Sequence, residues 1–325
     1  MKVRARSVLL AAALGCSIAA SAAGAGCIAP VFRVVALPLR PTAINARGWV
    51  AGTNSRGRAS VWDEHGGVRE LPLPAGFDIS EGVGIDAAGR VLAIASDRTS
   101  SKHQAFVVYR NRLELLPGSQ TRGYRINATG TISGEAQMPG QPNTEPVLWV
   151  HGALRPLGHC CGGAARDVNR DGAAIGDAYA AAGVFHAFLW TAAAGLKIIG
   201  PPGRYSTAIA INDLGHVLIQ AFPDVYLYEG GALQRLTLAP RYPSNPRAIN
   251  NCGAVVGAFG PYSDADRAFA WDPAEGFVDL NKRIPADSGW KLENAAGIND
   301  AGAIVGKGDY GGEDDSGFLL LPSPH

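Results

Sequence analysis

Long apolar segments are missing from this sequence after residue 25, so nothing beyond that point predicts a membrane anchor. Charged residues are also few, at 18% of 325 residues, whereas 42 residues are Gly. This composition argues against long helices and against disorder. It favours many short elements joined by tight turns.

A basic stripe is absent too. Once residues 1–25 are set aside, 26 basic residues remain against 28 acidic ones, a net charge of −2. Because affinity for nucleic acids depends largely on the neutralisation of phosphates, we expect no nucleic-acid partner.

Motifs of a specific chemistry are not found. The chain has no H-E-x-x-H, no G-x-S-x-G and no phosphate-binding P-loop. The cysteines after residue 25 are Cys27, Cys160, Cys161 and Cys252, and their spacing fits no zinc site. One disulfide or a few free thiols is the simpler expectation, and a strained bridge between the adjacent Cys160 and Cys161 is the alternative. We expect no catalytic residues, no metal site and no cofactor.

The first 25 residues have the three parts of a secretory signal peptide. Lys2, Arg4 and Arg6 form a basic segment, residues 8–20 form an apolar run, and small residues follow. The apolar run is too short to span a membrane, which takes roughly 20 residues. We expect residues 1–25 to be removed on export, and residues 26–325 to form one domain that is secreted to the periplasm or the extracellular medium.

One five-residue phrase occurs seven times: an apolar residue, Asn or Asp, two variable residues and Gly. The first copy is 44–48, the last is 298–302, and the others begin at Ile85, Ile126, Val168, Ile211 and Ile249. Successive copies start 41, 41, 42, 43, 38 and 49 residues apart, which is the length of a structural repeat. The Asn or Asp side chain can start a turn by accepting a backbone hydrogen bond, and the Gly supplies the positive φ that closes the turn.

Each repeat predicts four short strands. In the fourth unit these are 167–169, 173–176, 186–190 and 196–200, and turn residues bound every one. Four short antiparallel strands in about 40 residues are typical of a propeller blade. A large aromatic residue ends the third strand in six units and is expected to pack between neighbouring sheets. These residues are Trp62, Tyr109, Trp149, Trp190, Tyr228 and Trp271.

The two ends of the chain complete the count of blades. Residues 32–39 have the pattern of a fourth strand, and 303–306 and 318–321 supply a second and a third strand after the last phrase. We predict that these segments combine in one composite blade. The fold class is then all-β: a seven-bladed propeller of four-stranded antiparallel blades, whose last blade is closed by the N-terminal strand.

The units resemble the extracellular HAF-repeat family, which is named for a His-Ala-Phe tripeptide. His186-Ala187-Phe188 carries the tripeptide in full, and the phrase around Ile249, followed by Trp271, is similar to the family pattern. The resemblance covers about residues 31–322. It implies an exported protein with a propeller-like fold, no established reaction and no catalytic residues.

The loops of the last two units depart from the repeat. We expect the connection 281–294, the longest between blades, to bring Trp290 next to a set of acidic loops that carry Asp264, Asp266, Asp309, Tyr310 and Glu313. Because Trp290 does not fall at the aromatic position of the repeat, it is our candidate for stacking on a ligand whose donors the carboxylates accept. The alternatives are a solvated acidic rim, and a Trp290 that pins the long connection onto the last blade.

The sequence thus predicts a non-enzymatic, monomeric binding or interaction module. Its partner would be an extracellular or cell-surface ligand, either a glycan or a protein. The alternative is an extracellular propeller hydrolase or lyase acting on a carbohydrate or a lactone. That function would need two or more Asp, Glu or His side chains to converge at the mouth of the central channel.

Overall fold

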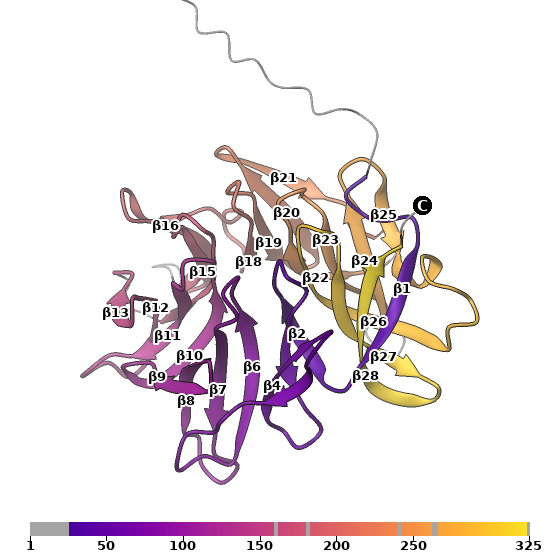
Figure 1. Ribbon diagram of the computed structural model, residues 1–325. Coiled ribbons are helices and arrows are strands. Elements are labelled where there is room, and N and C mark those ends of the chain that lie inside the picture. The colour runs from indigo at the N-terminus through magenta and orange to yellow at the C-terminus, as the bar shows by residue number, and fades with distance from the viewer. Residues whose placement is uncertain (1–25, 159–161, 180–182, 240–241, 262–265, 324–325) are drawn as a thin grey trace, which may run out of the picture.

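The protein is a ring of seven sheets. The computed structural model describes residues 26–158, 162–179, 183–239, 242–261 and 266–323. Within these ranges it has strands β1 to β28 and one short 3-10 helix, η1 (Leu280–Lys282). The described residues contain no helix that could span a membrane. The strands form seven antiparallel sheets of four, arranged around a common axis (Figure 1). The predicted fold class is confirmed.

Six blades use consecutive strands, innermost first. Blade one is β2 (Arg40–Ile44), β3 (Val50–Thr53), β4 (Ala59–Asp63) and β5 (Gly67–Glu70). Blade two is β6 (Ile79–Ile85), β7 (Val91–Ser96), β8 (His103–Tyr109) and β9 (Arg112–Leu115). Blade three is β10 (Ser119–Ile126), β11 (Ile132–Gln137), β12 (Thr144–Val150) and β13 (Ala153–Pro156).

Blades four to six repeat this order. Blade four is β14 (Gly163–Val168), β15 (Ala174–Tyr179), β16 (Phe185–Thr191) and β17 (Gly195–Ile198). Blade five is β18 (Thr207–Ile211), β19 (Val217–Ala221), β20 (Asp224–Glu229) and β21 (Ala232–Leu236). Blade six is β22 (Ser244–Ile249), β23 (Val255–Phe259), β24 (Arg267–Asp272) and β25 (Gly276–Asp279).

The seventh blade is composite, as predicted. It contains β26 (Trp290–Ile298), β27 (Ile304–Tyr310), β28 (Glu313–Pro322) and, on its outer edge, β1 (Phe32–Leu37). β1 runs antiparallel to β28, with Phe32 opposite Pro322 and Leu37 opposite Gly317. Figure 1 shows the indigo β1 alongside the yellow end of the chain. The two ends of the ring are therefore joined by backbone hydrogen bonds.

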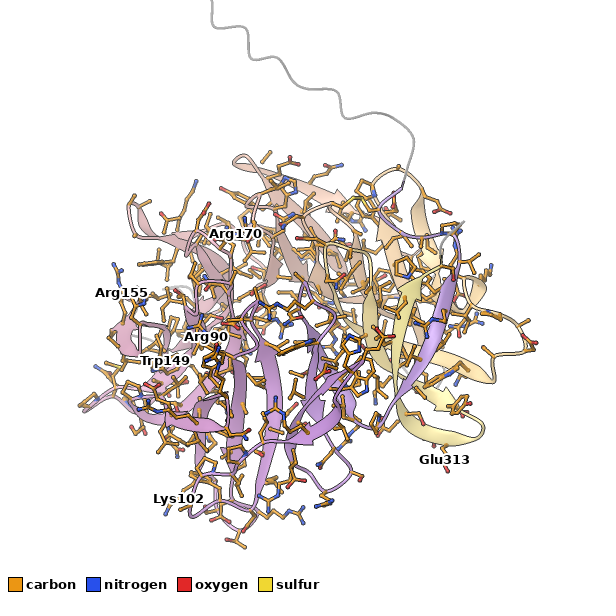
Figure 2. The ribbon with its side chains drawn as sticks, in the orientation of Figure 1. Arg90, Lys102, Trp149, Arg155, Arg170 and Glu313 are labelled. Atoms are coloured by element: carbon orange, nitrogen blue, oxygen red, sulfur yellow. A yellow bond between two sulfur atoms is a disulfide. The ribbon has the colours of Figure 1, made fainter. Side chains whose placement is uncertain are left out.

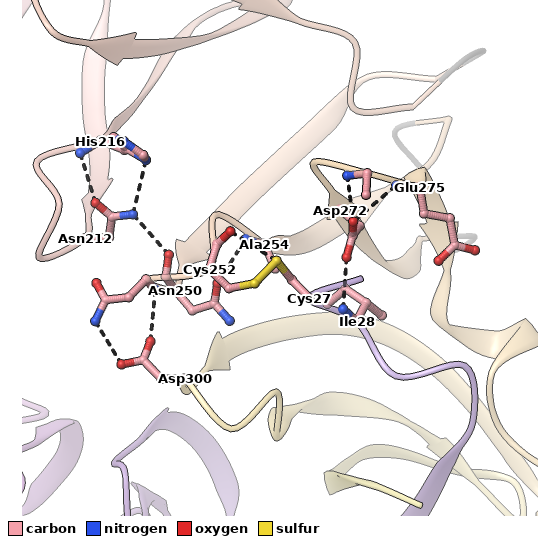
Figure 3. Close-up of a disulfide and its surroundings, with 12 residues drawn as sticks. Cys27, Ile28, Asn212, His216, Asn250, Cys252, Ala254, Asp272, Glu275 and Asp300 are labelled. Carbon is pink, nitrogen blue, oxygen red and sulfur yellow. Dashed lines mark hydrogen bonds between the residues drawn. A yellow bond between two sulfur atoms is a disulfide. The ribbon is translucent and has the colours of Figure 1, made fainter. Parts of the chain in front are cut away.

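A disulfide holds the N-terminal segment to a second blade. Cys27 is bonded to Cys252 in the first turn of blade six, with a Cα–Cα distance of 5.8 Å (Figure 3). The backbone N–H of Ile28 donates to Asp272 Oδ2 at 2.9 Å, also in blade six. One bridge agrees with the simpler expectation for the cysteines, while Cys160 and Cys161 lie outside the described residues.

The repeated phrase forms the turn that its residues predict. In blade one, Asn45 Oδ1 accepts the backbone N–H groups of Arg47 at 2.9 Å and Trp49 at 3.0 Å. Gly48 closes this turn with φ 79°, a conformation that residues with a Cβ rarely adopt. Asp86 makes the same two bonds in blade two, to Ala88 and Arg90.

The Asn side chains have a second role that the spacing alone did not predict. Each donates its Nδ2–H to the main-chain oxygen of the phrase in the next blade. The links run from Asn45 to Asp86, and then from Asn127 through Asn169, Asn212, Asn250 and Asn299 back to Asn45. We call this set the asparagine ring.

The asparagine ring is interrupted at blade two, because the carboxylate of Asp86 has no proton to donate. Arg90 lies next to this position. Its guanidinium is paired with Asp86, and a Cβ added to Gly130 of blade three would lie 2.4 Å from its nitrogens. The arginine therefore contacts blade three next to the point where the amide is missing.

The first strands line the central channel, since each contacts the first strands of both neighbouring blades around the full ring. Antiparallel order then gives the ring two faces. The turn face carries the turns between first and second strands and between third and fourth strands. The loop face carries the turns between second and third strands and the connections between blades. In Figure 2, Arg90 and Arg170 mark the turn face, whereas Lys102 and Glu313 mark the loop face at the lower edge.

One expectation about packing is wrong for a single blade. Trp149 and Trp190 are buried between sheets, at 0% and 6% exposed, as predicted for the third-strand aromatics. Tyr109 is 37% exposed instead, on the turn face. The Arg110 guanidinium lies 5.1 Å from the centre of its ring.

Candidate functional site

A network of polar side chains lies on the loop face between blades three and four. Its first half is centred on Glu135 in β11. Tyr124 donates its hydroxyl to Glu135 Oε1 and Thr144 donates to Oε2, both at 3.0 Å. Arg122 lies 3.8 Å away, and the Glu135 side chain is only 17% exposed. The carboxylate is thus fixed in place from three sides.

The second half is centred on Asp177 in β15. Arg166 Nε and Thr207 Oγ1 both donate to Asp177 Oδ1 at 2.8 Å. The Asp177 side chain is 6% exposed and the Arg166 side chain 38% exposed. Blades four and five therefore share this carboxylate.

Arg166 joins the two halves. Its guanidinium carbon lies 4.9 Å from the centre of the Tyr124 ring, within the range of a cation–π contact. Burial would lower the pKa of Arg166. The hydrogen bond that Arg166 donates to Asp177, together with the charge of Asp177, acts in the opposite direction, and the pKa is raised. Burial, followed by the charge of Glu135, raises the pKa of Tyr124 far above its usual value. Tyr124 is accordingly a neutral donor and Arg166 a permanent cation.

A cavity of about 540 Å³ opens beside this network. Its lining includes the polar residues Glu135, Arg166 and Asp177 and the aromatic residues Tyr179 and Phe185. The rings of Tyr179 and Phe185 meet edge to face with centroids 5.2 Å apart, and Tyr205 continues the row 6.4 Å beyond Phe185. The volume falls in the range typical of small-ligand pockets. We call this cavity the blade-three/four pocket.

The pocket offers acceptors, one cation and aromatic faces to a ligand. A carboxylate with two bonds already made retains lone pairs for further donors. Glu135 and Asp177 can therefore accept hydroxyl groups while the rings cover an apolar face. In the described ranges, no group of three or more His, Cys, Asp or Glu residues could hold a metal ion.

The sequence contained a signal for these residues that was not used. Tyr124 and Arg166 both stand three positions before the Asn of the repeated phrase, where the first strand faces the channel. Glu135 and Asp177 both follow directly after a second glycine, Gly134 or Gly176, that stands four positions beyond the Gly of the phrase. Polar residues at equivalent repeat positions in adjacent blades become neighbours in the ring. Comparison of the repeats position by position would have brought these four together.

Trp290, the centre of the predicted site, does not lie in a connection. The connection ends at residue 289 and Trp290 begins β26, opposite Tyr310 of β27. The two rings are stacked with centroids 4.7 Å apart and planes at 23°, and the edge of Phe318 lies 6.0 Å away. Trp290 is partly buried against the core of blade seven. Cross-strand aromatic pairing has extended the strand beyond its predicted start.

The other predicted residues divide into two groups. Asp309 and Glu313 lie beside Tyr310 in blade seven, where Asp309 Oδ1 accepts the backbone N–H of Gly312 at 3.0 Å. Asp266 is exposed in blade six and lines a separate cavity of about 200 Å³. Asp264 lies outside the described residues. The structure thus groups Trp290, Asp309, Tyr310 and Glu313, and places Asp266 at a different cavity.

Comparison with known proteins shows the fold. No family model matches the chain, and no curated protein matches it either. Virginiamycin B lyase from Staphylococcus aureus is 15% identical, with a TM-score of 0.56 over 89% of this chain and 99% of that one. The β-propeller domain of the Trilobed protease from Pyrococcus furiosus is 10% identical, with a TM-score of 0.60 over 89% and 97%. That domain has an open velcro topology, whereas β1 closes the ring here.

A puromycin hydrolase is also similar, at 17% identity and a TM-score of 0.53, over 87% of this chain and 53% of the hydrolase. These likenesses correct one prediction. We predicted a non-enzymatic protein because the sequence combines a propeller repeat with no catalytic motif, but a lyase and a hydrolase have a similar fold. The prediction of a non-enzymatic protein is therefore wrong as an inference from the fold. Identities this low establish the fold alone.

Proposed function

We propose that this protein is an exported HAF-repeat propeller that binds a neutral glycan in the blade-three/four pocket. The observation that carries the proposal is the fixed pair of carboxylates, Glu135 and Asp177, facing a cavity with an aromatic wall. Sugar hydroxyls are donors for such carboxylates, and the apolar face of a sugar ring fits against Tyr179 and Phe185. A few placed polar groups in a partly aromatic cavity are the usual form of a ligand site.

Two further observations support export and the family. The Cys27–Cys252 bridge is of a kind that persists in oxidising compartments. In the His-Ala-Phe tripeptide, Ala187 and Phe188 are fully buried, so the tripeptide serves packing, as a repeated motif should.

Calorimetric titration with cellobiose, xylobiose and chitobiose tests the binding proposal. We expect at least one disaccharide to bind, and Asp177→Asn to weaken it by about tenfold or more, since hydrogen bonds to charged groups are the strong ones. Thermal melting of Asp177→Asn checks that the loss does not come from misfolding of the variant. Glu64→Gln, on the turn face, is the charge control. Absence of binding by all three sugars would overturn the proposal.

Cleavage of the same glycan is a second candidate function. The specific observation is that two carboxylates border one cavity, beside Tyr124, whose neutral hydroxyl is bonded to Glu135 and whose ring lies against the Arg166 guanidinium. Paired carboxylates can act as general acid and base in glycoside hydrolysis. Release of reducing ends from the bound sugar, lost in both Glu135→Gln and Asp177→Asn, would establish it. Intact sugar after prolonged incubation would exclude it for that ligand.

A further inference from the structure

The exposed aromatic side chains of the protein are concentrated on one face. Six Tyr, Phe or Trp residues of the described ranges are markedly exposed: Tyr109, Tyr179, Tyr205, Phe222, Tyr242 and Tyr310, at 37–56%. Tyr109 is on the turn face. The other five are on the loop face, in or between blades four to seven. A distribution this uneven indicates a binding surface, because scattered exposed residues would occur on both faces.

Four of these five follow one another from the blade-three/four pocket around the ring. Tyr179 ends β15, Tyr205 lies in the connection to blade five, Phe222 is in the turn before β20, and Tyr242 is in the connection to blade six. We call these four residues the aromatic arc. Phe185 fills the step between its first two members, with ring centroids 5.2 and 6.4 Å from theirs.

The next step of the arc is held by Arg204. Its guanidinium donates to the main-chain oxygens of Ala221 at 3.1 Å and Phe222 at 2.9 Å, and to Asp224 Oδ2 at 2.9 Å. The connection that carries Tyr205 is thereby tied to the turn that carries Phe222. A cavity of about 200 Å³ then links Phe222 to Asp266 of blade six. The exposed aromatic residues thus follow one another from the pocket to blade six.

Carboxylates accompany the aromatic arc along its length. Asp177 lies at its start, paired with Arg166; Asp224 lies beside Phe222, paired with Arg204 and Arg235; and Asp266 lies at its far end. Aromatic residues are also frequent in protein interfaces, but Asp and Glu are depleted there. Aromatic faces that alternate with hydrogen-bond acceptors suit a polyhydroxylated chain better, since each unit of such a chain has an apolar face and several donors.

We propose that the aromatic arc is an extended subsite that takes an oligosaccharide chain whose end occupies the blade-three/four pocket. This inference rests on the proposed function and goes beyond it: the ligand is a polymer and not a free mono- or disaccharide. Affinity then comes from several weak stacking contacts added to the polar contacts of the pocket.

Titration with cello-, xylo- and chito-oligosaccharides of two to six units tests the arc. We expect affinity to rise at least tenfold from the dimer to the hexamer of the bound sugar. Phe222→Ala and Tyr242→Ala should each weaken hexamer binding by about threefold to tenfold, and leave dimer binding unchanged. Tyr109→Ala is the matched control, since it removes an aromatic of similar exposure from the turn face.

The outcomes separate the two proposals. If the dimer and the hexamer bind equally and the Phe222 and Tyr242 variants bind the hexamer normally, the arc is overturned while the pocket proposal stands. If no oligosaccharide of any length binds, both are overturned, and a protein partner becomes the occupant that this face fits. If Asp177→Asn weakens dimer and hexamer alike while the arc variants affect the hexamer alone, both are supported.

Discussion

Asn299 donates its side-chain N–H to the main-chain oxygen of Asn45, 254 positions earlier, at 3.0 Å. This bond joins the first turn of blade seven to that of blade one, next to the central channel. The closure of the ring is therefore made twice: at the outer edge by β1 against β28, and at the centre by the asparagine ring.

Asn299→Asp tests the inner closure. The carboxylate can still accept from the backbone N–H groups of Ala301 and Ala303, as Asn does now at 3.1 and 3.0 Å, but it cannot donate to Asn45. We expect the free energy of unfolding to fall by about 1–3 kcal/mol, because the buried main-chain oxygen of Asn45 loses one of its two donors, keeps only the N–H of Gly48 at 3.0 Å, and faces a carboxylate oxygen instead. Chemical denaturation measures this loss.

Asp86→Asn is the converse variant. It supplies the missing donor of the asparagine ring but gives up the ion pair with Arg90, so we expect a smaller change than at Asn299. Equal stability of wild type and Asn299→Asp would show that the ring is not a source of stability.

Removal of the disulfide tests the outer closure. In Cys27→Ser with Cys252→Ser, the N-terminal segment keeps its β1 pairing but loses a covalent link across 225 residues of sequence. Loss of a native disulfide typically costs about 2–5 kcal/mol, so we expect a lower melting temperature. Wild type treated with reductant should approach the variant, and the variant itself should not respond to reductant. A variant that melts like the oxidised wild type would contradict this account.

Trp290→Ala distinguishes packing from ligand stacking in blade seven. The indole contacts Tyr310 and Phe318 and is partly buried, so its loss should cost about 2 kcal/mol, less than for a fully buried Trp. Tyr310→Ala, at a residue 45% exposed, should cost less. Thermal melting measures both. Unchanged melting together with lost binding of an oligosaccharide would instead favour the predicted ligand role of Trp290.

The repeat made the fold predictable because the same few residue types form the same turn in every blade. An Asn with Gly three positions later specifies a turn locally, and seven copies at similar spacing specify a ring. The site was less predictable, since Glu135 and Asp177 are adjacent only through the curvature of the ring. Trp290 was expected in a connection for a related reason. Its deviation from the repeat reflects pairing with Tyr310, which no spacing within one repeat reveals. Deviations from a repeat indicate either function or local packing, and only the neighbouring blade decides between them.

Asp167 carries the prediction for pH. Its Oδ1 accepts the backbone N–H of Val168 at 2.8 Å and its Oδ2 that of Ile211 in blade five at 3.0 Å. Burial raises the pKa of Asp167 to about 6, against the opposing effects of Arg125 and these two hydrogen bonds. Between the ordinary pKa of 3.8 and about 6, the folded protein therefore holds a proton that the unfolded chain has released.

The sign of the effect follows from this difference in bound protons. Where the folded state binds more protons, the free energy of unfolding falls as the pH rises. We expect Asp167 to lower the stability by about 2–3 kcal/mol between pH 4 and pH 7, and to have no further effect above pH 7. In Asp167→Asn the amide oxygen keeps one of the two acceptor bonds and does not titrate. The difference in unfolding free energy between wild type and this variant, measured by denaturation at several pH values, isolates Asp167 from all other titrating groups. The stability of the wild type relative to Asp167→Asn should fall as the pH rises from 4 to 7. A difference that stays constant with pH would contradict a raised pKa at this position.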